Sequence, residues 1–288
     1  MQGQLVIEAP AKINLTLNVL GKRHDGYHEL ETVMQQISLK DLITLCPGGE
    51  GIRIKSSSAG IPGDESNLAW QAARLMFEEF SIAAGLQIYI EKNIPVGAGL
   101  AGGSTDAAAV IKGIDRLWGL NLSLERKCAL ALELGSDVPF CLVGGTALAR
   151  GRGEVLTALP EGPCLDMVLV KPDFQLSTAE IYQNFRLDRV KSVPDNRAFL
   201  EAWRQCDIMA LAAQMKNVLE SVSIPRCPEV AVIKQKLDDC QALASLMSGS
   251  GPSVVGLFGN REAARQAWEI MKDQYEESYL VSSYGRGD

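Results

Sequence analysis

The stretch "PVGAGLAGGSTDAAAV", residues 95–110, constrains the fold more than any other part of the chain. Four glycines, Gly97, Gly99, Gly102 and Gly103, stand within seven positions and precede a run rich in alanine. Glycine adopts backbone conformations that other residues avoid, and it lets other groups approach the main chain closely. Small alanines let a helix lie close to its neighbours. The pattern therefore predicts a tight loop that leads into a closely packed helix.

A glycine loop at the start of a helix is well suited to bind phosphate. Its backbone N–H groups can turn inward, and the first helical turn adds unpaired donors and a partial positive charge. Ser104 or Thr105 can cap the helix and turn a hydroxyl toward a phosphate or its magnesium ion. A glycine-rich turn before a packed helix, with no ligand, would show the same residues.

Two other phosphate motifs fit this loop less well. The loop lacks the G-K-[ST] ending of a Walker A motif and the lysine that goes with it. Gly97, Gly99 and Gly102 spell G-x-G-x-x-G after a strand-like segment, as in dinucleotide folds. The acid expected about 20 residues later should end a second strand, but Glu125 lies in a helical stretch. A dinucleotide site is therefore disfavoured.

Composition and charge indicate which kinds of partner and which cellular compartment suit the chain. The chain has 288 residues, a net charge of -7 and a pI of about 5.1, which disfavours nucleic acid or a membrane surface as the main partner. Its start lacks a secretion signal, and no stretch approaches the roughly 18 apolar residues that span a bilayer. Its seven cysteines form no C-x-x-C pair, and the odd number suits free thiols. We expect a cytoplasmic protein.

Hydrophobic periodicity in the first half mixes strands with helices. Alternation at period two predicts strands over "QLVIEA" (4–9), "KINLTLNVL" (12–20) and "LQIYIEK" (86–92), and helical spacing predicts a helix over 67–80. After the glycine loop, one helix follows directly and "SLERKCALALELG" predicts a second that ends at Gly135. These segments predict an α+β or α/β domain.

The second half begins after the Pro- and Gly-rich "LPEGPC", where we place a domain boundary between residues 160 and 161. Strands are predicted over "DMVLVKP" (166–172) and "SYLVSSY" (278–284), and a glycine loop enters a strand in "SGSGPSVVGLF" (248–258). A helix is predicted over 261–275. The order predicts helices on one face of a small antiparallel sheet.

The glycine loop resembles the P-x-x-x-G-L-x-[SG]-S motif of the GHMP kinases, the superfamily of galactokinase, homoserine kinase and mevalonate kinase. Three further stretches narrow the resemblance to members that phosphorylate a cytidine-containing intermediate of the non-mevalonate isoprenoid pathway. They are "APAKINLTLNVLGKRHDGYHEL" (9–30), "LGSDVPFCLVGGTALARGRGE" (134–154) and "SGSGPSVVGLF" (248–258).

The resemblance implies an α+β protein with the two-domain GHMP kinase fold. Its N-terminal domain, residues 1–160, would resemble domain 2 of ribosomal protein S5 and carry the ATP loop and the catalytic residues. Its C-terminal domain, residues 161–288, would be ferredoxin-like and complete the substrate site.

The catalytic residues that the resemblance implies are Asp137, as the base that accepts the hydroxyl proton, and Lys12, as the charge partner beside it. Phosphoryl transfer to an alcohol needs both functions. Without the resemblance, Asp137 before "VPF" is better explained as a helix N-cap, and Lys12 as a solvated residue of an edge strand.

The resemblance also assigns ATP and Mg²⁺ to the glycine loop. Ser104 is the candidate magnesium ligand, with the ion held mainly by ATP and water. Asp106 would repel phosphate if it pointed inward, so we expect it to face solvent or magnesium. The loop at Gly249, Ser250 and Gly251 would approach the substrate phosphates, although a hairpin turn would also explain it. The implied phosphate-binding residues are Pro95, Gly97, Gly99, Leu100, Ala101, Gly102, Gly103, Ser104 and Thr105.

The two histidines, His24 and His28, stand four residues apart in "GKRHDGYHEL". A zinc site is disfavoured because no second ligand pair follows at a suitable spacing. The resemblance implies instead that Tyr27 stacks on a cytosine ring and that His28 hydrogen-bonds its edge. A flat ring beside a donor or acceptor is what base recognition requires.

Further binding residues rest on the resemblance alone. Tyr182 would lie on the other face of the cytosine, Thr178 near the substrate, and Asn14 would contact the substrate from the same strand face as Lys12. Simple core packing would also explain the segment around Tyr182. Asn67 and Lys92 are the implied adenine contacts.

The expected partner is thus a small molecule with a cytidine diphosphate group, bound by a monomer or weak homodimer. Two alternatives stay open. An ATP-dependent decarboxylase of the same superfamily would use the same loop and aspartate, and a GHMP-fold sensor would bind ligand without chemistry. The Tyr27–His28 pair argues against the first, and the presence of both Lys12 and Asp137 argues against the second.

Overall fold

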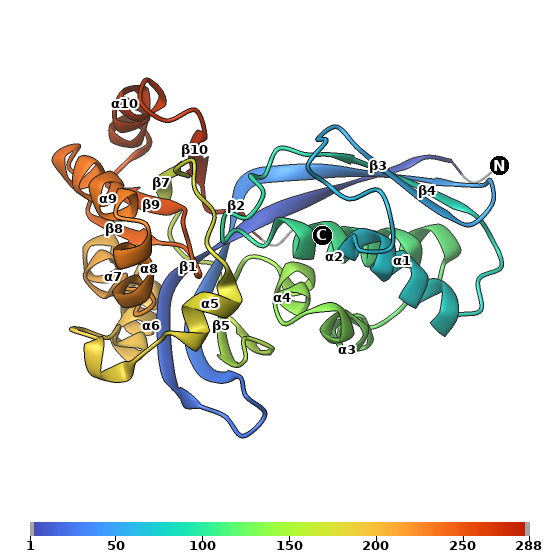
Figure 1. The fold of residues 1–288 in the computed structure, drawn as a ribbon, viewed down its shortest axis with the longest axis horizontal. Coiled ribbons are helices and arrows are strands. Elements are labelled where there is room, and N and C mark those ends of the chain that lie inside the picture. The colour runs from blue at the N-terminus through green and yellow to red at the C-terminus, as the bar shows by residue number, and fades with distance from the viewer. Residues whose placement is uncertain (1–2, 286–288) are drawn as a thin grey trace. The chain divides into compact units, whose positions relative to one another are not determined.

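The computed structural model describes residues 3–285, which divide into two compact units (Figure 1). The long strands β1 (Leu5–Lys22) and β2 (His28–Pro47) pair with each other, and each contributes residues to both units. Unit 1 comprises the described residues up to Ala11, 39–96 and 101–144. Unit 2 comprises residues 12–38, 97–100 and the described residues from 145 onward. Each unit therefore consists of several separate segments of the chain. The domain boundary predicted between residues 160 and 161 stays a prediction.

Unit 1 combines part of a sheet with the glycine-loop helix. The elements that lie wholly in it are β3 (Ile52–Ser56), α1 (Leu68–Glu79), β4 (Leu86–Glu91), α2 (Gly102–Trp118), α3 (Leu124–Leu134) and α4 (Val138–Val143). Strand β4 runs parallel to β3 and antiparallel to residues Leu42–Pro47 of β2. In Figure 1, α1 to α4 gather on one side of these strands.

Helix α2 packs closely against the strands of unit 1, as its small residues predict. An added Cβ on Gly113 would lie 2.2 Å from Cδ1 of Leu45 and 2.7 Å from Cδ1 of Ile7. The helix also has an apolar face toward the core, since Val110 and Ile111 are fully buried. The closeness of α2 to the sheet is therefore fixed by the absence of side-chain volume on this face.

Unit 2 contains a second sheet with its own helices. Its elements are β5 (Thr146–Gly151), β6 (Val155–Ala158), β7 (Asp166–Val170), α5 (Thr178–Gln183), η1 (Leu187–Arg189), α6 (Asn196–Gln205), α7 (Ile208–Gln214), α8 (Glu220–Arg226), α9 (Glu229–Asp239), β8 (Ala244–Met247), β9 (Val254–Phe258), α10 (Arg261–Lys272) and β10 (Ser278–Ser282). Residues Leu30–Gln35 of β2 pair with β5, which pairs with β6. The second sheet has the order β10-β7-β9-β8, and every pair in it is antiparallel.

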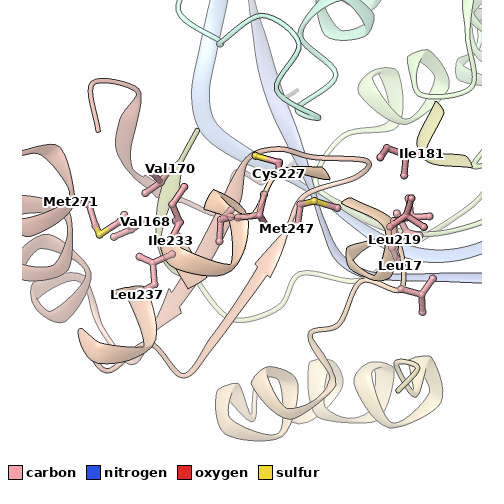
Figure 2. Close-up of a cluster of buried hydrophobic side chains, with 14 of the residues drawn as sticks. Leu17, Val168, Val170, Ile181, Leu219, Cys227, Ile233, Leu237, Met247 and Met271 are labelled. Carbon is pink, nitrogen blue, oxygen red and sulfur yellow. The ribbon is translucent and has the colours of Figure 1, made fainter. Parts of the chain in front are cut away.

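The core of unit 2 lies between this second sheet and helices α9 and α10 (Figure 2). Val168 and Val170 of β7 pack with Ile233 and Leu237 of α9 and with Met271 of α10. Period-two alternation in the strand and helical spacing in α9 and α10 place these apolar side chains on facing surfaces. The prediction of helices packed against a small antiparallel sheet is confirmed.

Most predicted elements are present, with two corrections. The two strands predicted over 4–9 and 12–20 are one continuous strand, β1, because Pro10 does not interrupt it. Helix α2 begins at Gly102 with Ala101 as its N-cap in the left-handed region at φ 56°, without a side-chain cap. The predicted cap at Ser104 or Thr105 is therefore wrong. Within residues 3–285, no helix has both the length and the apolar character needed to cross a membrane.

Candidate active site

The first part of the glycine loop, residues 97–100, contacts the late glycine loop within unit 2. Gly97 and Gly99 have φ values of 65° and 74°, which glycine tolerates best. The hydroxyl of Ser248 donates to the carbonyl oxygen of Gly99 at 3.2 Å. An added Cβ on Gly99 would lie 2.5 Å from the carbonyl oxygen of Ser248 and 2.9 Å from that of Gly251. The two predicted phosphate loops are thus in direct contact.

The loop is also fixed to strand β1. The backbone N–H of Lys12 donates to the carbonyl oxygen of Leu100 at 3.1 Å. The late loop is held from its other side by Asn217, whose amide Nδ2 donates to the carbonyl oxygens of Met247 at 2.8 Å and Gly249 at 2.7 Å. Asn217 carries no motif, so the sequence offered no signal for this anchor.

The second part of the loop forms the first turn of α2 in unit 1. The hydroxyl of Thr105 donates to the carbonyl oxygen of Pro10 at 2.8 Å, and Thr105 is buried. Ser104 is half-buried in the same turn and offers a hydroxyl oxygen of the kind that magnesium binds. The first amides of a helix have no partner within the helix, so this turn can donate to an anion. Binding of phosphate by these residues stays a prediction.

A buried ion cluster lies beneath this turn of α2. The Nζ of Lys92 donates to Oδ2 of Asp41 at 2.5 Å and to Oδ2 of Asp106 at 2.9 Å. An added Cβ on Gly102 would lie 3.0 Å from the same Nζ. Asp106 is buried, so the expectation that it faces solvent is wrong: its Oδ2 faces Lys92. A contact of Asp106 with magnesium stays a prediction. The predicted contact of Lys92 with adenine stays a prediction.

The cluster shifts the pKa values of Asp106 and Lys92. Burial raises the pKa of Asp106, the charge of Lys92 lowers it and the charge of Asp41 raises it, with a resulting pKa of about 7. Burial lowers the pKa of Lys92, but the attraction of Asp106 and Asp41 outweighs it, so the pKa is raised. The Oδ1 of Asp106 has no hydrogen-bond partner among the described residues. The ammonium of Lys92 thus donates hydrogen bonds to two carboxylates.

Asn67, the other implied adenine contact, acts as the N-cap of α1. Its Oδ1 accepts from the N–H of Ala69 at 2.9 Å, and its Nδ2 donates to the carbonyl oxygen of Pro62 at 2.8 Å. This geometry satisfies one of the unpaired donors at the start of the helix. A contact of Asn67 with adenine stays a prediction.

Lys12 is buried, at 5% exposure, and so is not the solvated edge-strand residue of the alternative interpretation. Its Nζ donates to Oδ1 of Asn14 at 2.9 Å. Asn14 is two residues further along β1, so both side chains project from the same face of the strand. The predicted pairing of these two residues on one strand face is therefore present in unit 2.

Asp137 stands at the N-cap position of α4, with φ -83° and ψ -19°, but its side chain makes no capping hydrogen bond. The alternative role as a side-chain cap is therefore not realised. Pro139 is in the first turn of this helix, where its missing N–H costs nothing. The catalytic role of Asp137 stays a prediction.

His28 lies among aromatic rings in unit 2. Its ring centroid is 5.4 Å from that of Tyr182 and 6.2 Å from that of Phe185. Burial, followed by the charge of Lys22, lowers the pKa of His28. A neutral imidazole presents one donor and one acceptor, as hydrogen bonding to a base edge requires. Phe185 was not predicted, although its position three residues after Tyr182 is a helical spacing.

Tyr27 is 55% exposed and has a cation on its ring. The guanidinium Cζ of Arg152 lies 4.9 Å from the ring centroid, a cation–π distance. Arg152 belongs to "GRGE" at the end of the stretch 134–154, and its contact with Tyr27 was not predicted. An exposed aromatic ring next to His28 fits the predicted role in stacking on a base.

A hydrogen bond between Thr178 and Ser250 connects the start of α5 with the late glycine loop, the two remaining segments predicted to contact substrate. Their hydroxyl oxygens are 2.8 Å apart. A side chain on Gly251 would be strained, because its φ is 88° and its Cβ would lie 2.4 Å from Sδ of Met247. The start of α5 and the late glycine loop are therefore connected within unit 2.

Comparison with known proteins identifies the class. The model of the GHMP kinases N terminal domain matches residues 67–145, and that of the GHMP kinases C terminal matches residues 199–277. A relative from Syntrophomonas wolfei subsp. wolfei is 55% identical over 284 residues, 99% of this chain and 100% of its own. One solved structure matches with a TM-score of 0.84 and 33% identity, over 98% of this chain and 100% of that one.

A second solved structure, mevalonate pyrophosphate decarboxylase from Streptococcus pyogenes, matches with a TM-score of 0.78 over 100% of this chain and 98% of that one. At 12% identity, this likeness shows the fold alone. The chain belongs to the GHMP kinases, and the predicted α+β, two-domain GHMP kinase fold is confirmed. The Syntrophomonas relative is a 4-diphosphocytidyl-2-C-methyl-D-erythritol kinase, and the first solved structure is a 4-(cytidine 5'-diphospho)-2C-methyl-D-erythritol kinase.

Proposed function

We propose that this GHMP kinase transfers the γ-phosphoryl group of ATP to the 2-hydroxyl of 4-diphosphocytidyl-2-C-methyl-D-erythritol, in non-mevalonate isoprenoid precursor biosynthesis. Identity of 55% over 99% of the chain to a kinase of that name supports the substrate. The observation within the structure that carries the proposal is the grouping of His28 with Tyr182, next to the exposed ring of Tyr27. Two flat rings and a neutral imidazole suit a pyrimidine base.

The transfer is a direct in-line displacement with Asp137 as the base. The carboxylate of Asp137 accepts the proton of the 2-hydroxyl, the oxygen forms a bond to the γ-phosphorus, and the bond from that phosphorus to the β,γ-bridging oxygen breaks. ADP leaves with the bonding electrons. The ammonium of Lys12, held by Asn14, stabilises the negative charge of the transferring group.

The phosphates of ATP bind along the glycine loop and the first turn of α2, where backbone N–H groups meet the positive end of the helix dipole. Magnesium, when bound with ATP, neutralises charge on the β- and γ-phosphates. We propose Ser104 as the magnesium ligand at this turn, because its half-buried hydroxyl oxygen is the kind of atom that coordinates magnesium. A cytoplasmic location and a monomer or weak homodimer complete the proposal.

The substrate is held by residues of unit 2. Tyr27 stacks on the cytosine, His28 bonds its edge, and Tyr182 lies against the imidazole of His28, which supports a place for it on the other face of the base. The hydroxyl of Thr178, fixed by Ser250, is available near the diphosphate end.

A coupled assay of ADP release, with ATP and magnesium, tests this function. The acceptors are 4-diphosphocytidyl-2-C-methyl-D-erythritol, mevalonate, mevalonate diphosphate, homoserine and galactose. We expect ADP release with the first alone. Release with mevalonate diphosphate would indicate the decarboxylase alternative, and binding of ATP without release for any acceptor would indicate a sensor.

A further inference from the structure

A chain of buried hydrogen bonds connects Lys12 to the interior of the β1–β2 pair. The Nζ of Lys12 donates to Oδ1 of Asn14 at 2.9 Å, and Nδ2 of Asn14 donates to Oγ1 of Thr32 at 2.8 Å. The hydroxyl of Thr32 donates to the carbonyl oxygen of Thr16 at 2.5 Å. All four residues belong to unit 2, and none is exposed by more than 5%.

Each bond in this chain can run in one direction only. A carbonyl oxygen only accepts, so the single proton of the Thr32 hydroxyl is committed to Thr16. The oxygen of that hydroxyl must therefore accept from Asn14, and only the amide nitrogen of Asn14 can donate to it. The amide oxygen of Asn14 then faces Lys12, whose ammonium has donors and no acceptor. A flipped amide would place donor against donor at one end and acceptor against acceptor at the other.

The far end of the chain is anchored by the main chain and by α6. The N–H of Val33 donates to Oγ1 of Thr16 at 2.9 Å, and that hydroxyl donates to Oδ1 of Asn196 at 2.7 Å. The carbonyl oxygen and the hydroxyl of Thr16 are thus both engaged. Because Thr16 and Thr32 lie on paired strands, the chain cannot shift without breaking several buried bonds, each costly to lose.

We propose that Thr32 is a positioning residue for phosphoryl transfer: its hydroxyl fixes the amide of Asn14, which fixes the ammonium of Lys12. The proposal rests on the proposed role of Lys12. Thr32 lies on β2, two residues after the end of the stretch 9–30, so no pattern in the sequence assigns it to the site.

The test compares Thr32→Val, which removes the hydroxyl and keeps the shape, with Thr146→Val as a matched control. Thr146 is a buried threonine of the neighbouring strand β5, and its hydroxyl donates to Gln35, outside the chain that leads to Lys12. We expect both variants to lose thermal stability. Only Thr32→Val should lower kcat, by about 10-fold or more, because small misplacements of a catalytic group are costly. KM for ATP should change less than about twofold, and Thr32→Ser should restore kcat.

Further variants keep the outcomes distinct. If Thr32→Val does not fold, Thr32→Cys replaces it, since a thiol is a weak hydrogen-bonding group. Adding Thr32→Val to Asn14→Ala should lower kcat by less than about twofold more, because the link to Lys12 is already broken. Wild-type kcat in Thr32→Val, or an equal fall in Thr146→Val, would overturn the positioning role. Wild-type kcat in Lys12→Met would instead overturn the proposed function of Lys12.

Discussion

The carbonyl oxygen of Gly99 accepts a hydrogen bond from the hydroxyl of Ser248 at 3.2 Å, and the α-carbon of Gly99 faces the carbonyl oxygen of Ser248. A Cβ on Gly99 would come within 2.5 Å of that oxygen, closer than such contacts allow. Gly99 is therefore required by its contact with the second loop as well as by its φ of 74°.

Gly99→Ala should disrupt this contact. We expect a loss of about 1–3 kcal/mol of stability from backbone strain. KM for ATP should rise at least about 10-fold, corresponding to about 1.4 kcal/mol of binding. Steady-state kinetics and urea unfolding measure both. Gly60→Ala is the control, because its Cβ would meet only Oγ of Ser58 at 3.9 Å. An unchanged KM in Gly99→Ala would contradict the role of the loop in binding ATP.

Asp137→Asn should lower kcat by about 10²–10⁴ while substrate binding persists, the usual range for loss of a general base. The stability of the variant is measured separately, so that a loss of turnover is not confused with a loss of folded protein. Single-turnover kinetics and a thermal melt separate the two effects. Turnover close to that of the wild type would exclude Asp137 as the base.

Tyr182→Ala should raise KM for the cytidylyl substrate about 10- to 100-fold, as expected for loss of about 1–3 kcal/mol of base stacking. KM for ATP should not change. Tyr182→Phe keeps the ring that lies 5.4 Å from His28 and should behave like the wild type. A collapse of ATP affinity in Tyr182→Ala would mean that α5 serves the nucleotide donor instead.

The Asp41–Lys92–Asp106 cluster predicts a pH-dependent stability. The pKa of Asp106 is about 7 in the folded protein, above the value of about 3.9 for an unfolded aspartate. Between these values the folded state binds more protons than the unfolded state. The stabilising contribution of protonated Asp106 to the free energy of unfolding is therefore fully present below about pH 4 and is lost as the pH rises toward 7.

The comparison of wild type with Asp106→Asn isolates this contribution, because the amide resembles the protonated carboxyl and does not titrate. We expect the stability of the wild type, relative to Asp106→Asn, to fall with pH by up to about 1.4 kcal/mol per unit over this window. Urea unfolding at about pH 4.5, 5.5 and 6.5, all between the two pKa values, measures the difference in the free energy of unfolding between the two proteins. A constant difference across these pH values would contradict the raised pKa.

The sequence predicted much of the local structure because periodicity and glycine content act over short distances. Helix α10 and strand β10 follow directly from their patterns, and Gly135 ends α3 as expected. The cap of α2 was missed because Ala101 adopts the left-handed region, where alanine is rare and no local signal marks it. Two strands were predicted in place of β1 because proline usually interrupts strands, and Pro10 lies between the two predicted segments.

By itself, the sequence determined the family, the glycine loop and the candidate pairing of Lys12 with Asn14 on one strand face, since motifs and period-two spacing are local properties. Only the tertiary structure decided which groups meet across the chain. Asp106 faces Lys92 instead of solvent, and Thr32 orients Asn14, because strands and a helix distant in sequence bring these polar atoms together away from water. Buried polar groups must find partners, and those partners are set by the fold.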